Sequence, residues 1–267
     1  MRRLQAHSIH HKSPLSLCIS VKTRYNFIVM DNQYTRTALL IGEEKLNKLW
    51  NKKVLVFGLG GVGGSVVESL ARFGIGSFDL VDNDTFSITN INRQLLATRK
   101  TCGKDKVDVA EERIHDINPD IIVNKHKTFY LPERKEEFDF TKFDYIIDAI
   151  DTITAKLDII ESAVKTNVPI ISAMGCGNRL DPTKLVLCDL FETKGDPLSK
   201  VMRRELKKRG ITSLKVVYST ETPTKPIREI KGDDSTRRKD IPGSTSFVPP
   251  VAGTLIGYQV AKDLLNS

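Results

Sequence analysis

A glycine-rich segment that follows an apolar run is the first part of the sequence that could do chemistry. Residues 58–63 read Gly-Leu-Gly-Gly-Val-Gly, which fits Gly-x-Gly-x-x-Gly, and Asp82 stands 24 residues after Gly58. Glycines in this pattern permit a tight turn, the first amides of the next helix face a phosphate, and the later carboxylate binds ribose hydroxyls. The pattern predicts a nucleotide site at Gly58, Gly60, Gly61, Gly63 and Asp82. The alternative is a turn needed only for packing, and the pattern alone does not separate NAD from ATP.

The residues after Asp82 favour chemistry at a phosphate over hydride transfer. The polar and charged side chains we single out are Asp84, Asn90, Arg93, Gln94 and Lys106. Charge that develops on phosphoryl oxygens has to be met by Arg, Lys or Mg²⁺, whereas a dehydrogenase needs little beyond its ribose carboxylate. Lys106 begins an expected helix, where the helix dipole disfavours a cation, so we expect it to face an anion. The alternative is that Asp105 and Asp108 neutralise it on the surface.

Two aspartates end a later strand-like run. Asp148 and Asp151 follow the apolar residues 145–147, and open parallel sheets bind ligands at the carboxyl ends of their strands. Asp151, together with bound phosphates, could hold Mg²⁺. The alternative is that Asp151 and Thr152 only cap the next helix.

Alternating strand and helix patterns must position these residues. Short apolar runs predict strands near residues 53–57, 78–81, 121–123, 145–147 and 169–171, and residues 185–188 form a further strand-like run that we expect in the core. Helical spacing predicts helices between several of them, the clearest over residues 106–117, which Asn118-Pro119 ends. Repeated strand–helix units indicate an α/β fold, a Rossmann-like and mainly parallel sheet with helices on both faces.

Charge is distributed unevenly along the chain. Of 267 residues, 40% are apolar and 28% charged, an ordinary globular composition, and the net charge is +8. Residues 194–239 carry 14 basic and 6 acidic residues. They include a helix expected to begin at Asp196-Pro197 and to end at Gly210. Its outward side chains are expected to be Lys200, Arg203, Arg204, Lys207 and Lys208. Such a segment favours a polyanionic partner, although basic residues also simply solvate surface helices.

The N-terminal stretch and the cysteines bear on location. Residues 1–30 hold five basic and no acidic residues and show no sustained period. This composition is typical of a transit peptide; the alternative, which we favour, is that translation starts at Met30. In either case we expect residues 1–30 to be a disordered extension. The uncharged run 241–261 contains three prolines, so we expect no membrane span. The four cysteines form no Cys-x-x-Cys pair, which indicates free thiols in a reducing compartment such as the cytoplasm.

These motifs, taken in order, resemble the adenylating domain of the ubiquitin-activating-enzyme-like, or ThiF-type, superfamily. The resemblance is carried by residues 58–64, 82–84, 90–94, 106 and 148–151. Within the superfamily the sequence is most similar to the tRNA threonylcarbamoyladenosine dehydratases. Residues 35–42, 89–94, 180–183 and 244–253 carry that closer similarity, which spans residues 31–265.

The resemblance implies that ATP and Mg²⁺ activate a carboxylate. In the dehydratases the threonyl carboxylate of the modified tRNA adenosine is adenylated, and ring closure expels AMP. It also implies a homodimer and, as in some relatives, a sulfurtransferase partner. The alternative within this chemistry is adenylation of the C-terminal glycine of a ubiquitin-like sulfur-carrier protein. A nicotinamide-dependent oxidoreductase and a catalytically silent nucleotide-binding scaffold are alternatives from other classes.

Roles for individual residues follow from the same resemblance. The glycines would hold the phosphates, and Asp82, with Asp84 beside it, would hold the ribose. Arg93 and Lys106 would stabilise the α-phosphoryl transition state, supported by Asn90 and Gln94, and Asp151 would bind Mg²⁺. Arg36 matches the N-terminal arginine that reaches the other subunit's ATP in a homodimer; the alternative is a surface arginine beside a helix cap.

Two departures from the sulfur-carrier enzymes favour the tRNA interpretation. The chain lacks the paired Cys-x-x-Cys motifs that hold zinc in those enzymes. Cys176 is the nearest candidate for a nucleophile, but it lies in a glycine-rich strand exit with no His near it in the sequence, which favours burial as a small hydrophobe. Ring closure of a threonylcarbamoyl group needs no enzyme thiol. We expect an ATP-binding core over residues 31–193, with the basic helix, loop and C-terminal helix of residues 194–267 completing the same domain.

Overall fold

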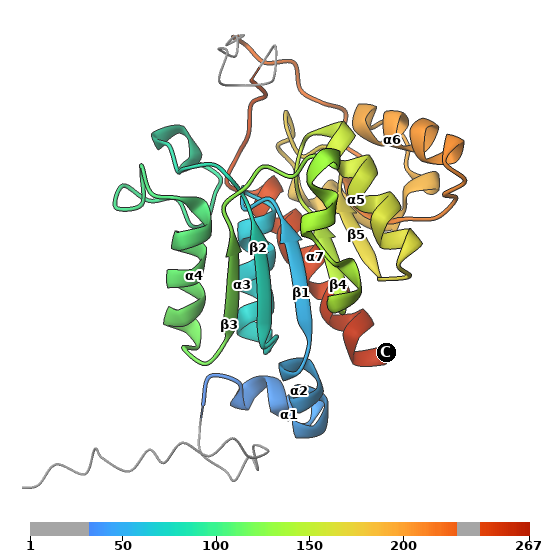
Figure 1. The fold of residues 1–267 in the computed structure, drawn as a ribbon. Coiled ribbons are helices and arrows are strands. Elements are labelled where there is room, and N and C mark those ends of the chain that lie inside the picture. The colour runs from blue at the N-terminus through green and yellow to red at the C-terminus, as the bar shows by residue number, and fades with distance from the viewer. Residues whose placement is uncertain (1–31, 229–240) are drawn as a thin grey trace, which may run out of the picture. The chain divides into compact units, whose positions relative to one another are not determined.

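Seven strands form one sheet in the part of the chain that this computed structural model describes, residues 32–228 and 241–267 (Figure 1). The strands are β1 (Lys53–Phe57), β2 (Ser77–Val81), β3 (Ile122–His126), β4 (Tyr145–Asp148), β5 (Ile170–Ala173), β6 (Leu185–Asp189) and β7 (Lys215–Ser219). Their order is β3-β2-β1-β4-β5-β7-β6, and all neighbours are parallel except β6 and β7. The predicted mainly parallel sheet is confirmed, and β7 is a strand that the sequence patterns did not predict.

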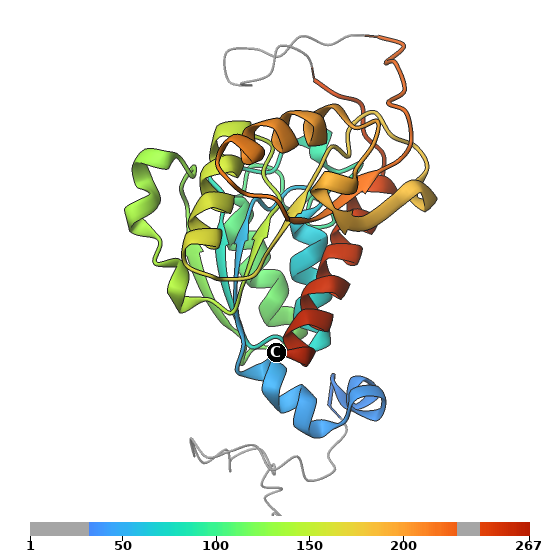
Figure 2. The ribbon, with the colours of Figure 1, turned by 90° about the vertical axis from the view of Figure 1, so that its right-hand side faces the viewer.

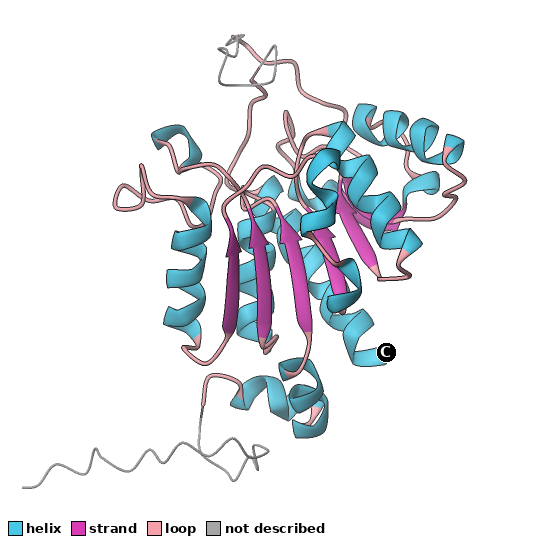
Figure 3. Ribbon diagram, in the orientation of Figure 1, coloured by secondary structure: helices cyan, strands magenta, loops and turns pink. Residues whose placement is uncertain are grey.

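Helices cover both faces of this sheet (Figures 2 and 3). They are α1 (Thr35–Ile41), α2 (Glu43–Trp50), α3 (Gly63–Phe73), α4 (Lys106–Ile117), α5 (Ile153–Lys165), α6 (Pro197–Lys208) and α7 (Val248–Asn266). Helices α3, α4 and α7 pack on one face, and α5 packs on the other with α6 beside it. No helix within the described ranges is long and apolar enough to cross a membrane.

The side chains of β1 show why the sheet needs cover on both faces. Val54 and Val56 lie in the cluster formed with α3, α4 and α7, whereas Leu55 and Phe57 lie in the cluster formed with α5. All four are fully buried. A strand buried on both sides has to be apolar at every position, which is why this run was recognisable in the sequence.

The carboxyl ends of β1, β2, β4 and β5 lie along one edge of the sheet, which we call the carboxyl edge (Figure 1). Helices α1 and α2 lie beyond the opposite, amino edge. Topology therefore gathers the residues that follow these four strands into one region, as expected for an open parallel sheet.

A fully buried ion pair fixes the carboxyl ends of β4 and β5. The Nζ atom of Lys156, on α5, lies 2.8 Å from Oδ2 of Asp148. It also donates to the carbonyl oxygens of Ile150, at 3.1 Å, and Ala173, at 2.8 Å. The hydroxyl of Ser172 donates to the same Asp148 oxygen at 2.5 Å. Because each buried charge has a partner, the pair joins two strands and a helix without leaving a charge uncompensated.

Replacing Lys156 by Met should destabilise the protein by roughly 3–5 kcal/mol, because Asp148 is left as an unpaired buried charge. Lys165→Met is the matched control, since Lys165 is exposed in the last turn of the same helix. Its effect should stay within about 0.5 kcal/mol. Urea unfolding of both variants measures the difference. Equal stabilities would show that the buried pair does not hold these strands.

Candidate nucleotide-binding site

The glycine loop between β1 and α3 is closed by backbone atoms that approach one another closely. The amide of Gly58 donates to the Val81 carbonyl at 2.8 Å, and Gly58 has a φ of +88°. A Cβ at Gly58 would lie 2.8 Å from the carbonyl oxygen of Ala149, and one at Gly63 would lie 1.8 Å from that of Gly58. A Cβ at Gly61 would lie 2.9 Å from the Arg93 carbonyl oxygen. These three glycines are therefore required by the fold itself.

Gly60 differs from the other three loop glycines. The nearest atom to a Cβ built there is Nε2 of Gln94, at 3.9 Å, so the protein would tolerate a side chain at this position. Gln94 is only 7% exposed, and its Oε1 atom has no hydrogen-bond partner in the described part of the chain. Buried acceptors normally have partners, so an unpaired one beside an open glycine fits a site that a ligand completes.

Asp82 follows β2 and lies against the glycine loop. Its carboxylate accepts from the backbone amides of Leu59, at 2.7 Å, and Asp84, at 2.9 Å. Burial raises the pKa of Asp82, and the nearby charge of Lys106 together with the two amide bonds opposes that rise. The structure thus places the predicted ribose ligand beside the predicted phosphate loop.

Lys106 is the first residue of α4 and is buried. Its Nζ atom lies 2.8 Å from Oδ2 of Asp84 and 3.9 Å from Oδ1 of Asp82. The alternative in which Asp105 and Asp108 neutralise it is wrong. Those carboxylates instead pair with Lys127 and Lys125. The carboxylates that compensate the positive charge of Lys106 at this helix N-terminus are therefore those of Asp84 and Asp82, beside the glycine loop.

The turn of residues 88–94 carries Asn90, Arg93 and Gln94. Asn90 caps this turn, because its Oδ1 accepts from the backbone amide of Ser87 at 3.0 Å. Arg93 donates through Nη1 to the Thr89 carbonyl oxygen at 2.8 Å. The contact of the Arg93 backbone with Gly61 places the whole turn beside the glycine loop. Part of the role of Asn90 is thus structural.

Asp151 is exposed after β4, between Ile150 and the start of α5. Thr152 is the N-cap residue of α5, and its side chain makes no capping hydrogen bond. Residues 32–228 and 241–267 contain no cluster of three or more His, Cys, Asp or Glu side chains that could hold a metal ion. A Mg²⁺ ion at Asp151 would therefore take most of its ligands from phosphates and water, which is how Mg²⁺ is commonly held.

Arg36 is the one predicted site residue that lies apart from the others. It is exposed on α1, beyond the amino edge, whereas the glycine loop lies at the carboxyl edge (Figure 1). Tyr34 anchors this helix through a hydrogen bond from its hydroxyl to the Ala71 carbonyl at 3.1 Å. Arg36 therefore does not join the nucleotide site of its own chain.

The interpretation of Cys176 as a packing residue fits its surroundings. Burial, with a contribution from the negative charge of Asp196, raises the pKa of the Cys176 thiol to about 12. A thiol in that state is a poor nucleophile at neutral pH, because the thiolate is the reactive form.

The basic helix α6 begins after the predicted cap. Asp196 accepts from the backbone amide of Ser199 at 2.7 Å. The expectation that Arg203 points outward is wrong: it is half-buried, and its Nη1 donates to the Thr193 carbonyl oxygen at 2.8 Å. Four basic side chains of the helix are exposed, namely Lys200, Arg204, Lys207 and Lys208. Arg204 and Lys208 both pair with Glu205, so part of the local charge is neutralised.

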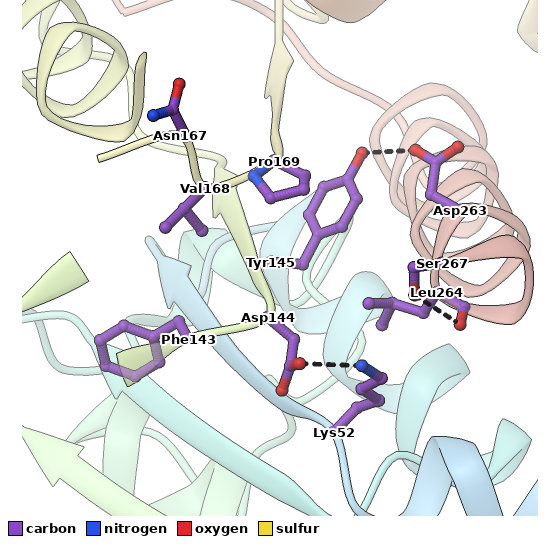
Figure 4. Close-up of a pocket in the computed structure, with 10 residues that line it drawn as sticks. All are labelled: Lys52, Phe143, Asp144, Tyr145, Asn167, Val168, Pro169, Asp263, Leu264 and Ser267. Carbon is purple, nitrogen blue, oxygen red and sulfur yellow. Dashed lines mark hydrogen bonds and ion pairs between the residues drawn. The ribbon is translucent and has the colours of Figure 1, made fainter. Parts of the chain in front are cut away.

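A hollow at the amino edge is a poor candidate for the site (Figure 4). Its charged and polar side chains already have partners: Lys52 pairs with Asp144 at 2.9 Å, and the Tyr145 hydroxyl donates to Asp263 at 2.7 Å. It also lies at the end of β4 opposite to Asp148 and the glycine loop. We therefore assign the nucleotide site to the carboxyl edge.

The approach to α7 is a part of the site that sequence reasoning missed. Pro249 lies close to Gly61, where a Cβ would be 2.9 Å from the proline Cβ. The Ser244 carbonyl oxygen accepts from Nδ2 of Asn92 at 2.9 Å. Residues 244–253 match the family pattern, but they contain no chemical motif that would place them at the site.

The glycine loop between β1 and α3, with Asp82 after β2, defines a nucleotide-binding domain of the Rossmann-like class. The model of the ThiF family matches residues 34–259, and the chain belongs to this family. The tRNA threonylcarbamoyladenosine dehydratase of Bacillus subtilis (strain 168) is 43% identical over 244 residues, which are 89% of this chain and 96% of that protein. The dehydratase of Escherichia coli (strain K12) is 35% identical over 198 residues, 71% of this chain and 74% of that protein.

A solved structure gives the same result for the fold. The crystal structure of the E. coli dehydratase in complex with ATP matches with a TM-score of 0.79 and 30% sequence identity. The match covers 88% of this chain and 94% of that chain.

Gly63→Ala and Gly60→Ala should separate the two roles of the glycine loop. The first should lower the free energy of unfolding by roughly 3 kcal/mol, because its Cβ would overlap the Gly58 carbonyl oxygen. The second should change it by less than about 1 kcal/mol, since a Cβ at Gly60 would make only an ordinary van der Waals contact, with Nε2 of Gln94 at 3.9 Å. Chemical denaturation measures both. Similar losses in the two variants would contradict the distinction.

Proposed function

We propose that this chain is an ATP-dependent dehydratase that acts on threonylcarbamoyladenosine in tRNA. It transfers AMP to the threonyl carboxylate with release of pyrophosphate, and ring closure of the threonylcarbamoyl group then expels AMP. The observation that carries the proposal is the set at the carboxyl edge: an open glycine, an unpaired buried acceptor, a ribose-type carboxylate and two cations. The identity to dehydratases over most of the chain gives the reaction its substrate.

The proposed role of each residue in the site follows from its charge. The glycine loop and the N-terminus of α3 face the phosphates, and the Asp82 carboxylate receives the ribose hydroxyls. Arg93 and Lys106 offset charge that develops on the α-phosphoryl oxygens. Asp151 holds Mg²⁺, which neutralises phosphate charge when bound. The high pKa of Cys176 accords with a route that needs no enzyme thiol.

The position of Arg36 supports a homodimer in which this residue serves the partner's nucleotide. It lies at the edge opposite to its own glycine loop. On the same short helix Leu39 is 82% and Leu40 is 88% exposed, and large apolar side chains this exposed favour a protein interface. We also propose a sulfurtransferase partner, on the basis of the family resemblance. A cytoplasmic location is proposed on the same resemblance and on the free cysteines among the described residues.

We propose that residues 31–267 form one domain. Strand β7 pairs with both β5 and β6, and α7 contributes to the core cluster on the face covered by α3. The segment 194–267 therefore supplies a strand inside the sheet and a helix on its face. This arrangement supports the proposal that it completes the domain formed by residues 31–193.

Replacing Arg93 by Ala should lower AMP release by about 10²-fold or more, because a donor to the transition state is lost. The assay follows AMP released from ATP in the presence of tRNA that contains threonylcarbamoyladenosine. Arg99→Ala, an exposed arginine on the following turn, should keep full activity. Wild-type turnover of Arg93→Ala would contradict the role assigned to Arg93. AMP release that requires a sulfur-carrier protein instead of tRNA would support the alternative substrate.

Mixing two inactive variants tests whether Arg36 acts across a dimer. Arg36→Ala and Arg93→Ala chains that are unfolded and refolded together form mixed dimers with one intact site. About a quarter of wild-type activity should return, since half of the dimers are mixed and one of their two sites is complete. No recovery, although the mixed dimer is detected by mass spectrometry, would place Arg36 in its own chain's site, and full activity of Arg36→Ala by itself would place it outside catalysis.

The exposed basic side chains of α6 should contribute to tRNA affinity. Replacing all four by Gln removes Lys200, Arg204, Lys207 and Lys208. If two or three of them contact phosphates, the slope of log affinity against log salt should flatten by roughly two units. ATP binding should be unchanged. Filter binding over a salt series measures the slope.

A charge-matched control separates a docking surface from general attraction. It replaces four exposed lysines of other elements, Lys45, Lys135, Lys142 and Lys165. The control should alter the slope much less. Equal slopes for the two variants would show that tRNA does not dock on α6.

A further inference from the structure

Asn92 connects two segments of the site that lie far apart in the sequence. Its Oδ1 atom accepts a hydrogen bond from Nη1 of Arg93 at 3.0 Å, and its Nδ2 atom donates to the Ser244 carbonyl oxygen at 2.9 Å. One side-chain amide thus binds a guanidinium on one side and a backbone carbonyl on the other. Because the two ends of the amide are chemically different, both bonds fix its orientation.

The same two segments also meet through the glycine loop. A Cβ at Gly61 would touch both the Arg93 carbonyl oxygen and the Cβ of Pro249, each at 2.9 Å. The 88–94 turn, the loop and the start of α7 therefore form one packed junction. The Asn92 bridge lies at that junction, directly beside Arg93.

We propose that Asn92 is a positioning residue for adenylation, which holds the Arg93 guanidinium in register with the α-phosphate by tying it to the approach to α7. The inference rests on the proposed function, and in particular on the role of Arg93. A free arginine samples many rotamers, and two acceptors, the Thr89 carbonyl and the Asn92 amide, restrict Nη1 to one place. Such preorganisation matters most in the transition state, where small displacements are costly.

The chemistry of the bridge sets what each substitution does. Ala at position 92 removes both hydrogen bonds. Asp keeps an acceptor for Arg93, but it places a carboxylate oxygen against the Ser244 carbonyl oxygen and an anion beside the guanidinium. Gln keeps a donor and an acceptor on a chain one methylene longer, so it can restore part of the bridge.

The test measures kcat and KM for ATP in the tRNA-dependent AMP assay, using full-length protein. Asn92→Ala should lower kcat by about 10- to 100-fold, the cost of a misplaced group, with KM for ATP changed less than about threefold. Asn92→Asp should be comparably slow, and Asn92→Gln should recover part of the rate. Asn266→Ala is the matched control, because Asn266 is an exposed asparagine whose amide donates to a backbone carbonyl on α7, at 2.8 Å.

The double variant distinguishes positioning from a separate structural role. If Asn92 acts through Arg93, then Asn92→Ala combined with Arg93→Ala should be no slower than Arg93→Ala alone. The inference about Asn92 would be overturned if the fold-loss of kcat in the double variant equalled the product of the two single losses. It would also be overturned if Asn92→Ala kept wild-type kcat while Arg93→Ala was slow. Neither result would contradict the role of Arg93. Wild-type kcat in Arg93→Ala would overturn the proposed role of Arg93 itself. Should Asn92→Ala fail to fold, Asn92→Asp and Asn92→Gln carry the same comparison.

Discussion

The close approach of three backbone segments at Gly58, Gly63 and Ala149 is the constraint on which the site depends. A single added carbon at Gly63 would lie 1.8 Å from the Gly58 carbonyl oxygen, and one at Gly58 would lie 2.8 Å from that of Ala149. The loop after β1 can close over the end of β4 only because side chains are absent there. On the other side of that strand end, Lys156 holds Ile150 in place from inside the protein.

Electrostatics in the site follow from this packing. Lys106 has a side chain that is 7% exposed, whereas that of its partner Asp84 is 62% exposed. In the proposed site, water could solvate Asp84 if a phosphate replaced it beside the lysine. Asp82 lacks that freedom, because its carboxylate is held by two backbone amides. A fixed carboxylate suits binding of a neutral ribose, and a cation with an exchangeable partner suits binding of a charged phosphate.

The sequence predicted the parts of the fold that depend on local pattern. The apolar run before Gly58 and the helix that begins at Lys106 were found because burial on two faces and helical periodicity leave clear signals. The glycine motif and Asp82 were found because their spacing follows from one strand–helix–strand unit. Strand β7 was missed although Val216, Val217 and Tyr218 form an apolar run as long as that of residues 145–147, because the run follows a basic segment that was interpreted as helix and loop.

What could not be predicted depends on contacts between distant segments. The inward turn of Arg203 depends on Thr193, and the pairing of Lys106 with Asp84 rather than Asp105 depends on how the chain folds back beside β2. The bridge from Asn92 to Ser244 joins residues 152 positions apart. The glycines also look alike in sequence, and only the structure separates Gly60, where a Cβ would meet no atom closer than 3.9 Å, from the three that the backbone requires.

Mass spectrometry of tRNA nucleosides tests the central claim most directly. Purified protein is incubated with ATP, Mg²⁺ and tRNA that contains threonylcarbamoyladenosine, and the nucleosides are then released under mild conditions that preserve the cyclised product. The account predicts that the modified nucleoside is replaced by one lighter by a single water molecule, only when ATP is present. An unchanged nucleoside with protein that is folded and binds ATP would contradict it.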